Sequence, residues 1–484
     1  MKAANFLVIM SDEHNPKVAG CAGHPVVDTP NLDALAARGT RFTSAYTTSP
    51  VCIPARAGFA CGKYIHQIGF WDNADAYDGS VPSWHHALRS RGHRVVSIGK
   101  LHFRLLDEDH GFTEEQIPMH IIEGKGDLMG LVREDLPRRG GAKKMAAMAG
   151  PGESPYTLYD KEICSRAQIW LHEEGTVDTG KPWVLFVSFV APHFPLTAPP
   201  EHFYRYWKRE LPMPKLYARE QRPRHPYLQD YRESFCYDDY FETEADVRRA
   251  VAGYFGLVSY LDENIGKILR VLEETGLAAS TRVMYTSDHG DNLGARGLWG
   301  KSTMYEEIAG VPLILAGPGV PAGAQVALPV SHVDAYPTIV ETAGVRFDDL
   351  KDTHPGVSLL DIANGARPER TVLSEYHGMG STTGAFAIRA GKWKYVHYVK
   401  YPPQLFDLER DPEEIHDLAG DAAHAKVVEE CRRKLYQLCD PAEVDRRAKA
   451  RQAELLQAHG GRDAVIRRGD LGFTPAPGFA ADFE

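Results

Sequence analysis

The feature that most constrains the fold is a series of short, strongly apolar runs separated by amphipathic stretches. The clearest runs are NFLVIM at 5–10, PWVLFVSFV at 182–190 and TRVMYTS at 281–287. Apolar runs without polar alternation are typical of strands buried on both faces, as in parallel sheets covered by helices. A stretch such as 244–275, with apolar residues three and four apart, is typical of the covering helices. The sequence therefore predicts an α/β fold with a large, mostly parallel sheet flanked by helices.

The pattern changes after about residue 370. Short apolar segments there flank a GKW turn, which predicts antiparallel hairpins in a small α+β subdomain. We therefore expect a large catalytic domain at 1–370, the antiparallel-sheet subdomain at 371–440, and a charged helix with an extended tail at 441–484. The tail is expected either to pack on its own subunit or to act as an oligomerisation arm. The sequence therefore allows both a monomer and a homo-oligomer.

Composition excludes several classes of partner. The chain has 484 residues and a formal net charge of -10, which argues against nucleic acid and anionic membrane as partners. No stretch approaches the roughly 20 apolar residues that a membrane span needs. The start, MKAANFLVIMSDEH, runs from a short apolar segment straight into acidic residues, unlike a signal peptide. The seven cysteines suggest no disulfide framework, and a cytoplasmic location is expected.

Polar side chains follow four of the predicted strands, at the point where each strand ends. Because the carboxyl ends of parallel strands meet at one edge of a sheet, we expect these side chains to converge there. A single Asp or His after a strand is usually structural, but four such clusters on one edge favour a functional site. The residues concerned are Asp12 and Glu13 after 5–10, Lys100 and His102 after 93–99, His193 after 182–190, and Asp288 and His289 after 281–287.

Several of these residues suit a divalent cation. Carboxylate oxygens with one imidazole favour Ca²⁺, with Mn²⁺ and Mg²⁺ as alternatives. The predicted protein ligands are Asp12, Glu13, Asp288 and His289. The cations Arg56, Lys100 and Lys301 are expected around the same pocket. A metal ion with several cationic side chains favours a small tetrahedral oxyanion, either sulfate or phosphate, as ligand.

The segment SPVCIPARAGFACG at 49–62 leaves three interpretations of Cys52. It is a buried thiol, a thiolate nucleophile, or the precursor of another group. Transfer of a sulfate group to a thiolate would leave a thiosulfate-like intermediate with no easy exit, which counts against the second interpretation. Pro54 indicates a helix that starts close to Cys52, which would place this residue at the positive end of a helix dipole.

CIPAR at 52–56 matches the C-x-P-x-R signature of the type I, formylglycine-dependent sulfatases of the alkaline phosphatase superfamily, and the chain resembles that family. Further segments resemble family landmarks in the family's order, among them GKLHF, APHFP, SDHGD and LWGKSTMYEE. GFWDNADAY resembles the choline-sulfatase-like branch, and the Asp288-His289 pair resembles phosphonate monoester hydrolases. Ala55 and Ala60-Cys61-Gly62 depart from the usual signature.

The resemblance implies an alkaline-phosphatase-like fold and a role for each site residue. A formylglycine-generating enzyme would oxidise Cys52 to Cα-formylglycine, whose hydrate is both the nucleophile and a metal ligand. The implied roles of the others are these: Arg56 and Lys100 hold the hydrate, His102 is the base that collapses the intermediate, His193 is the general acid, Lys301 assists it and binds sulfate, and Asn73 binds substrate with His193 and Lys301.

The expected activity is metal-dependent hydrolysis of a small anionic ester, an aryl or alkyl sulfate. Hydrolysis of phosphonate monoesters or phosphodiesters by the same site is the main alternative. Choline sulfate ranks lower, because a trimethylammonium group favours an aromatic cage and the insertion 110–155 contains only one aromatic residue, Phe112. A non-catalytic relative with an unmodified Cys52 is the remaining alternative.

Overall fold

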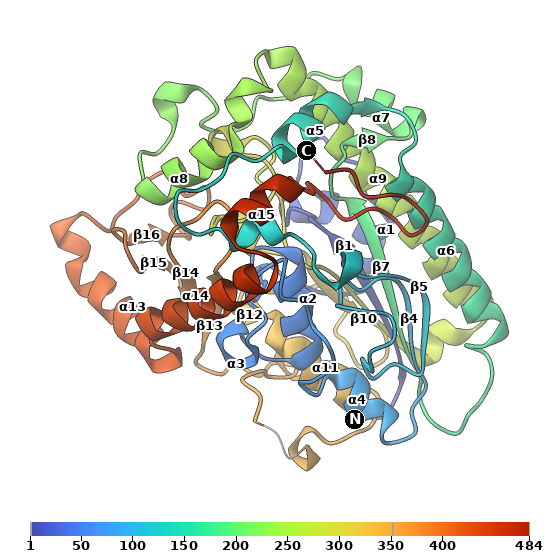
Figure 1. Ribbon diagram of the computed structural model, residues 1–484. Coiled ribbons are helices and arrows are strands. Elements are labelled where there is room, and N and C mark those ends of the chain that lie inside the picture. The colour runs from blue at the N-terminus through green and yellow to red at the C-terminus, as the bar shows by residue number, and fades with distance from the viewer. Residues whose placement is uncertain (1, 351–352, 484) are drawn as a thin grey trace.

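The computed structural model describes residues 2–350 and 353–483. Its centre is an eight-stranded sheet in the order β11-β2-β10-β9-β1-β7-β4-β5 (Figure 1). In that order the strands span Ala324–Val326, Gly39–Phe42, Leu313–Ala316, Thr281–Ser287, Asn5–Asp12, Val184–Pro192, Val95–Lys100 and Glu114–Met119. The five strands from β9 to β5 run parallel, as the apolar runs predicted. β10 differs, because it pairs antiparallel with both β9 and β2.

Helices cover both faces of the sheet, and β1 supplies side chains to both cores. Phe6, Val8 and Met10 belong to the core that α2 (Cys52–Cys61), α4 (Trp84–Arg89) and α11 (Ala335–Thr342) share. The alternate residues Leu7 and Ile9 belong to the core beneath α6 (Pro155–Glu173) and α9 (Glu244–Glu274). Figure 1 shows α6 and α9 together on one flank of the sheet. A strand buried on both faces explains why NFLVIM has no polar alternation.

The C-terminal part of the chain forms a separate antiparallel sheet, as expected. Its strands are β13 (Thr371–Tyr376), β14 (Ala385–Ala390), β15 (Trp393–Tyr398) and β16 (Gln404–Asp407). The GKW segment forms the turn between β14 and β15, where Gly391 has a φ of 57°. The boundaries at 370 and 440 stay predictions.

The last segment of the chain returns to the parallel sheet. After α13 (Ala425–Leu438) and α14 (Pro441–Ala458), a short helix that the sequence did not indicate, α15 (Arg462–Arg468), precedes the tail. In Figure 1 this red segment runs back towards α5 (Gly141–Met148). The Lys144 ammonium donates to the carbonyl of Asp482 at 2.7 Å, and the Tyr156 hydroxyl donates to the carbonyl of Thr474. The tail therefore packs on its own chain. Among the described helices, none combines the length and the apolar character needed to cross a membrane.

Glu375 of β13 fastens the C-terminal sheet to the large domain, and its replacement is expected to destabilise the fold. This fully buried carboxylate accepts hydrogen bonds from the backbone N–H of His66 at 3.2 Å and from its Nδ1 at 2.7 Å. Glu375→Gln is expected to lower the free energy of unfolding by about 2–3 kcal/mol in chemical denaturation. Glu409→Gln, at an exposed position, is the matched control.

The pH dependence of this loss follows from two opposite pKa shifts. Although burial alone would raise the pKa of Glu375, His66 and His377 hold it at about 2, so its contribution is present above its unfolded value and fades as the pH falls. Burial alone would lower the pKa of His66, but Glu375 raises it, so this contribution fades only at higher pH. The difference between wild type and variant should therefore be largest between about pH 4.5 and 6.5. An unchanged difference at pH 2.5 would contradict this account.

Candidate active site

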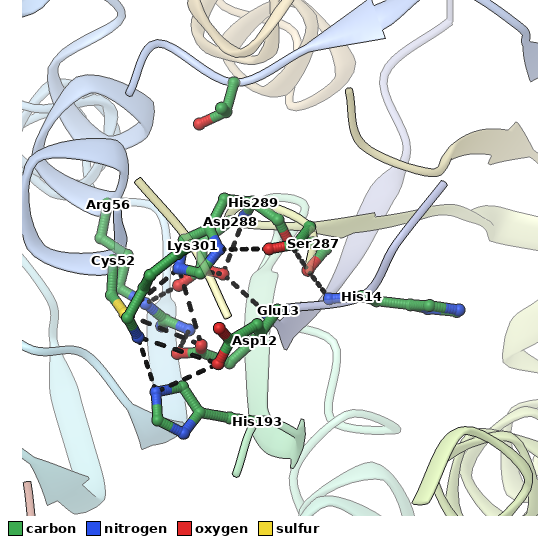
Figure 2. A network of polar contacts seen from close by, with 12 residues as sticks. Asp12, Glu13, His14, Cys52, Arg56, His193, Ser287, Asp288, His289 and Lys301 are labelled. Atoms are coloured by element: carbon green, nitrogen blue, oxygen red, sulfur yellow. Dashed lines mark hydrogen bonds and ion pairs between the residues drawn. The ribbon is translucent and has the colours of Figure 1, made fainter. Parts of the chain in front are cut away.

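The ends of the parallel strands bring the predicted residues together, as Figure 2 shows. Asp12 ends β1 and Glu13 follows it; Lys100 ends β4; His193 and Asp288 follow β7 and β9. All of these side chains are buried. Lys100 Nζ lies 2.6 Å from Asp12 Oδ2. Although burial alone would raise the pKa of Asp12, Lys100, His193 and Arg56 hold it well below its usual range. Asp12 is therefore an anion at neutral pH.

Cys52 lies at the first residue of α2, facing this group of side chains. Its Sγ is 3.1 Å from Lys301 Nζ, 3.2 Å from His289 Nε2 and 3.8 Å from Asp12 Oδ1. The side chain is 1% exposed. Burial and the Asp12 charge raise the pKa of the Cys52 thiol to about 11, against the opposing charge of Lys301. An unmodified Cys52 is therefore a neutral thiol at pH 7, which is a weak nucleophile.

Arg56, one turn further along α2, uses its guanidinium to hold the acids in place. Its Nε donates to Asp288 Oδ2 at 2.8 Å and its NH2 donates to Asp12 Oδ2 at 3.1 Å. The remaining nitrogen donates to the carbonyl of Lys100 at 2.7 Å and to Ser188 Oγ at 2.9 Å. Arg56 therefore binds β1, β4, β7 and the segment after β9 together from behind the site.

The acids and His289 fit a divalent cation. Both carboxylate oxygens of Glu13 are buried and have no hydrogen-bond partner among the described residues, and burial raises the pKa of this group well above its usual range. His289 Nδ1 donates to the carbonyl of Gly290 at 2.9 Å, which leaves Nε2 unprotonated and facing Cys52 and the acids. Ligand atoms of Asp12, Cys52, Asp288 and His289 lie within 4.8 Å of one another. Oxygen ligands with one imidazole suit Ca²⁺, Mn²⁺ or Mg²⁺.

His193 and Lys301 form a direct pair beside Cys52. His193 Nδ1 donates to the carbonyl of Phe194 at 2.5 Å, so its Nε2 accepts from Lys301 Nζ at 2.7 Å. The same Nε2 lies 3.3 Å from Glu13 Oε2. Both ring nitrogens of His102 are buried without a hydrogen-bond partner among the described residues, and His102 lines the pocket above Cys52. Burial and the Lys100 charge hold the pKa of His102 well below its usual range, which keeps this imidazole neutral.

A pocket with an empty volume of about 710 Å³, including open solvent at its mouth, lies over Cys52. Asn73 lines it as expected, and Trp71 of the same GFWDNADAY segment lies outside the lining and packs against His377. Arg56 and Lys100 are also absent from the lining, because they lie behind the acids. The wall contains five aromatic rings that the sequence did not indicate as a group: Phe194, Tyr231, Phe235, Tyr237 and Phe473.

The charged residues of the pocket wall were not predicted from the sequence either. Arg139 NH2 lies 2.8 Å from Asp127 Oδ2 and 2.6 Å from Asp470 Oδ1, so the tail closes one side of the pocket. The rings come from 194, 231–237 and 473 rather than from 110–155, and Phe112 is a core residue of the sheet. The low rank of choline sulfate therefore rested on a segment that does not supply the aromatic wall. Spacing along the chain gives no signal for residues this far apart.

Comparisons with known proteins fit this geometry. A family model described as Sulfatase matches residues 4–345, and one described as N-sulphoglucosamine sulphohydrolase, C-terminal, matches 294–440. The choline-sulfatase of Rhizobium meliloti (strain 1021) is 36% identical over 86% of this chain and 82% of its own length. Arylsulfatase K of Bos taurus is 29% identical over 86% of this chain and 78% of its own. The crystal structure of a phosphonate monoester hydrolase of Agrobacterium radiobacter has a TM-score of 0.74 at 24% identity, over 90% and 95%, which is a likeness of fold.

Proposed function

The chain belongs to the sulfatase family, and from this premise we propose that it hydrolyses a small alkyl or aryl sulfate ester with a nucleophile derived from Cys52. The observation that carries the proposal is the position of Cys52. Its Sγ lies at the base of the pocket, within 3.2 Å of both Lys301 Nζ and His289 Nε2. The Lys301 ammonium lies on one side of this atom and the candidate metal ligands lie on the other. This arrangement suits the transfer of a charged group to the atom at this position.

Two groups from outside the chain would complete the site. Oxidation of Cys52 to formylglycine, by a modifying enzyme that supplies the oxidant, would replace the neutral thiol with an aldehyde whose hydrate carries the attacking hydroxyl. A divalent cation held by Asp12, Glu13, Asp288 and His289 would supply positive charge beside the attacking oxygen and the sulfate. Arg56 and Lys100 keep Asp12 anionic and fixed, so that the ligand set is organised before substrate arrives.

The remaining side chains handle protons and the sulfate group. Sulfur would form a bond to the attacking oxygen at residue 52 as its S–O bond to the alcohol breaks, and the alcohol oxygen takes a proton from the His193–Lys301 pair, whose two nitrogens lie 2.7 Å apart. Lys301 also binds the sulfate by its charge. His102, neutral and without a partner in the described structure, is placed to take the proton that releases sulfate from the nucleophile.

Choline sulfate is a second candidate substrate, and the pocket wall is the observation that favours it. Five aromatic rings and two carboxylates, Asp127 and Asp470, line the space above Cys52. Aromatic faces attract a trimethylammonium group at about 0.5–2 kcal/mol each. One of these faces already carries a cation, since the Arg139 guanidinium lies 5.8 Å from the Phe235 ring centre. The 36% identity to a protein named choline-sulfatase supports the same candidate.

Parallel kinetics on three substrates test the proposal. The full-length protein, co-expressed with a formylglycine-generating enzyme, is assayed with choline sulfate, 4-nitrophenyl sulfate and a phenylphosphonate monoester. We expect kcat/KM for one or both sulfates to exceed that for the phosphonate by about 10²-fold or more. The reverse order would replace the proposal with phosphonate monoester hydrolysis. No turnover of any ester, with Cys52 fully converted as judged by peptide mass, would refute a hydrolytic role for this site.

A further inference from the structure

A second cluster of imidazoles and carboxylates lies on the edge of the sheet, among residues that the proposed mechanism does not use. It comprises His110 in the segment between β4 and β5, Glu115 on β5, and His120 one residue beyond β5, with Glu108 beside His110. His110 Nδ1 donates to Glu115 Oε1 at 3.0 Å, and His120 Nε2 lies 3.4 Å from Glu115 Oε2. On its other side, His110 Nε2 lies 3.9 Å from Glu108 Oε2.

His110 is buried, its three neighbours are half-buried, and much of their hydrogen-bonding capacity is unused. His110 is 1% exposed, and its Nε2 has no hydrogen-bond partner in the described structure. A hydrogen-bond partner among residues 2–350 and 353–483 is also lacking for both ring nitrogens of His120, for one oxygen of Glu108 and for one oxygen of Glu115. Burying an unpaired polar atom costs about 1–3 kcal/mol, so this many around one point call for a shared partner.

A purely structural His–Glu–His network explains only part of this arrangement. It accounts for the hydrogen bond from His110 Nδ1 to Glu115 and for the anionic state of that carboxylate. Although burial alone would raise the pKa of Glu115, the hydrogen bond from His110 and the adjacent imidazole of His120 hold it at about 2. It does not account for the imidazole of His120, both of whose nitrogens lack a hydrogen-bond partner within the described structure.

We propose that His110, Glu115 and His120 form a second metal site that binds a divalent transition-metal ion, with Zn²⁺ as the best match, and that Glu108 faces the other ring nitrogen of His110. Two imidazoles with carboxylate oxygens favour Zn²⁺ and its neighbours over Ca²⁺ or Mg²⁺. Bonds of about 2.0–2.1 Å to a tetrahedral ion place its ligand atoms about 3.4 Å apart. The separations of 3.0 and 3.4 Å around Glu115 need little adjustment to reach that value.

The position of the site indicates what the ion does. β5 is the last strand of the sheet and pairs only with β4 among the described strands. The backbone N–H of His102 donates to the carbonyl of Met119 at 2.7 Å, directly beside His120. An ion bound here joins the β4–β5 connection to the edge strand, next to the segment that carries Lys100 and His102. It therefore acts as a clip that stabilises the edge of the sheet.

Zinc titration of the metal-free, full-length protein tests whether the second metal site binds Zn²⁺ and stabilises the edge of the sheet. Asp288→Asn weakens the candidate active-site ligands, so calorimetry on this variant reports mainly on the second cluster. We expect it to bind about one Zn²⁺ per chain and to gain thermal stability with Zn²⁺. Adding His120→Gln should weaken that binding at least about tenfold and remove the gain. His172→Gln, at an exposed helical position, is the matched control and should change neither.

X-ray absorption at the zinc edge keeps the test independent of any variant that folds poorly. Wild-type protein loaded with one equivalent of Zn²⁺ should show two imidazoles on the ion, whereas each candidate ligand group of the active site offers one, His289 beside Asp12, Cys52 and Asp288, or His193 beside Asp12 and Glu13. A single imidazole, or equal Zn²⁺ affinity in Asp288→Asn with and without His120→Gln, would overturn the proposal. Neither result bears on sulfate-ester hydrolysis, because the two sites share no residue.

Discussion

Replacing Cys52 with alanine is expected to lower kcat for sulfate esters by about 10⁵-fold, the scale of loss when an enzyme loses its nucleophile. The expectation rests on the position of Sγ, which is the atom that Lys301 and His289 both approach within 3.2 Å. The measurement is kcat with 4-nitrophenyl sulfate, together with the mass of the peptide that carries residue 52. In the wild type, that peptide should carry an aldehyde in place of the CH₂SH group in proportion to the activity.

Cys21→Ala is the matched control for this experiment, because Cys21 is a free thiol in the short helical turn Gly20–Ala22 and does not line the pocket over Cys52. Its kcat should equal that of the wild type. Full activity in a protein whose Cys52 is wholly an unmodified thiol would refute the formylglycine mechanism. Retention of substantial activity by Cys52→Ala would refute any mechanism that starts from this residue.

Replacing His193 with alanine should have an effect that depends on the leaving group. For an alkyl sulfate, whose leaving oxygen is strongly basic, kcat/KM is expected to fall by about 10²–10⁴-fold. For 4-nitrophenyl sulfate the loss should be much smaller, because that phenolate leaves without a proton. The reason is the pair that His193 Nε2 and Lys301 Nζ form at 2.7 Å beside Cys52.

Two further variants sharpen this result. Lys301→Ala should also penalise the alkyl ester, and the double variant should lose far less than the product of the two single losses, since both residues serve one proton transfer. His172→Ala, at an exposed helical position, provides the control. Equal losses for both esters in His193→Ala would show that His193 positions the sulfate group rather than protonating the alcohol.

The convergence of the site could be predicted from sequence because it depends on local patterns. Each of β1, β4, β7 and β9 is an apolar run followed by polar residues, and parallel pairing brings their ends to one edge. Asp12 and Lys100, 88 positions apart in the sequence, form a buried ion pair for that reason. The antiparallel direction of β10 was not predictable, because a short apolar run is the same in either direction.

The pocket wall could not be predicted, because nothing local marks its residues. Arg139 and Asp470 form an ion pair across 331 positions, and only tertiary packing of the tail creates it. Phe473 and the rings at 231–237 come from segments whose composition is typical of surface turns. The helix α15 was also missed, since Val465 is its one buried residue and leaves no apolar periodicity to detect.

The place of β1 at the centre of the sheet has a consequence for the order of events during synthesis. Its neighbours are β7, which begins at Val184, and β9, which begins at Thr281. When Cys52 leaves the ribosome, neither partner of β1 exists, and the helix that buries Cys52 has no sheet to pack on. A modifying enzyme that needs an open peptide therefore has the time taken to make the roughly 230 residues from Cys52 to the start of β9 at Thr281. A protein released quickly from denaturant would have no such interval, so chemical refolding of unmodified chains should yield folded but unconverted protein.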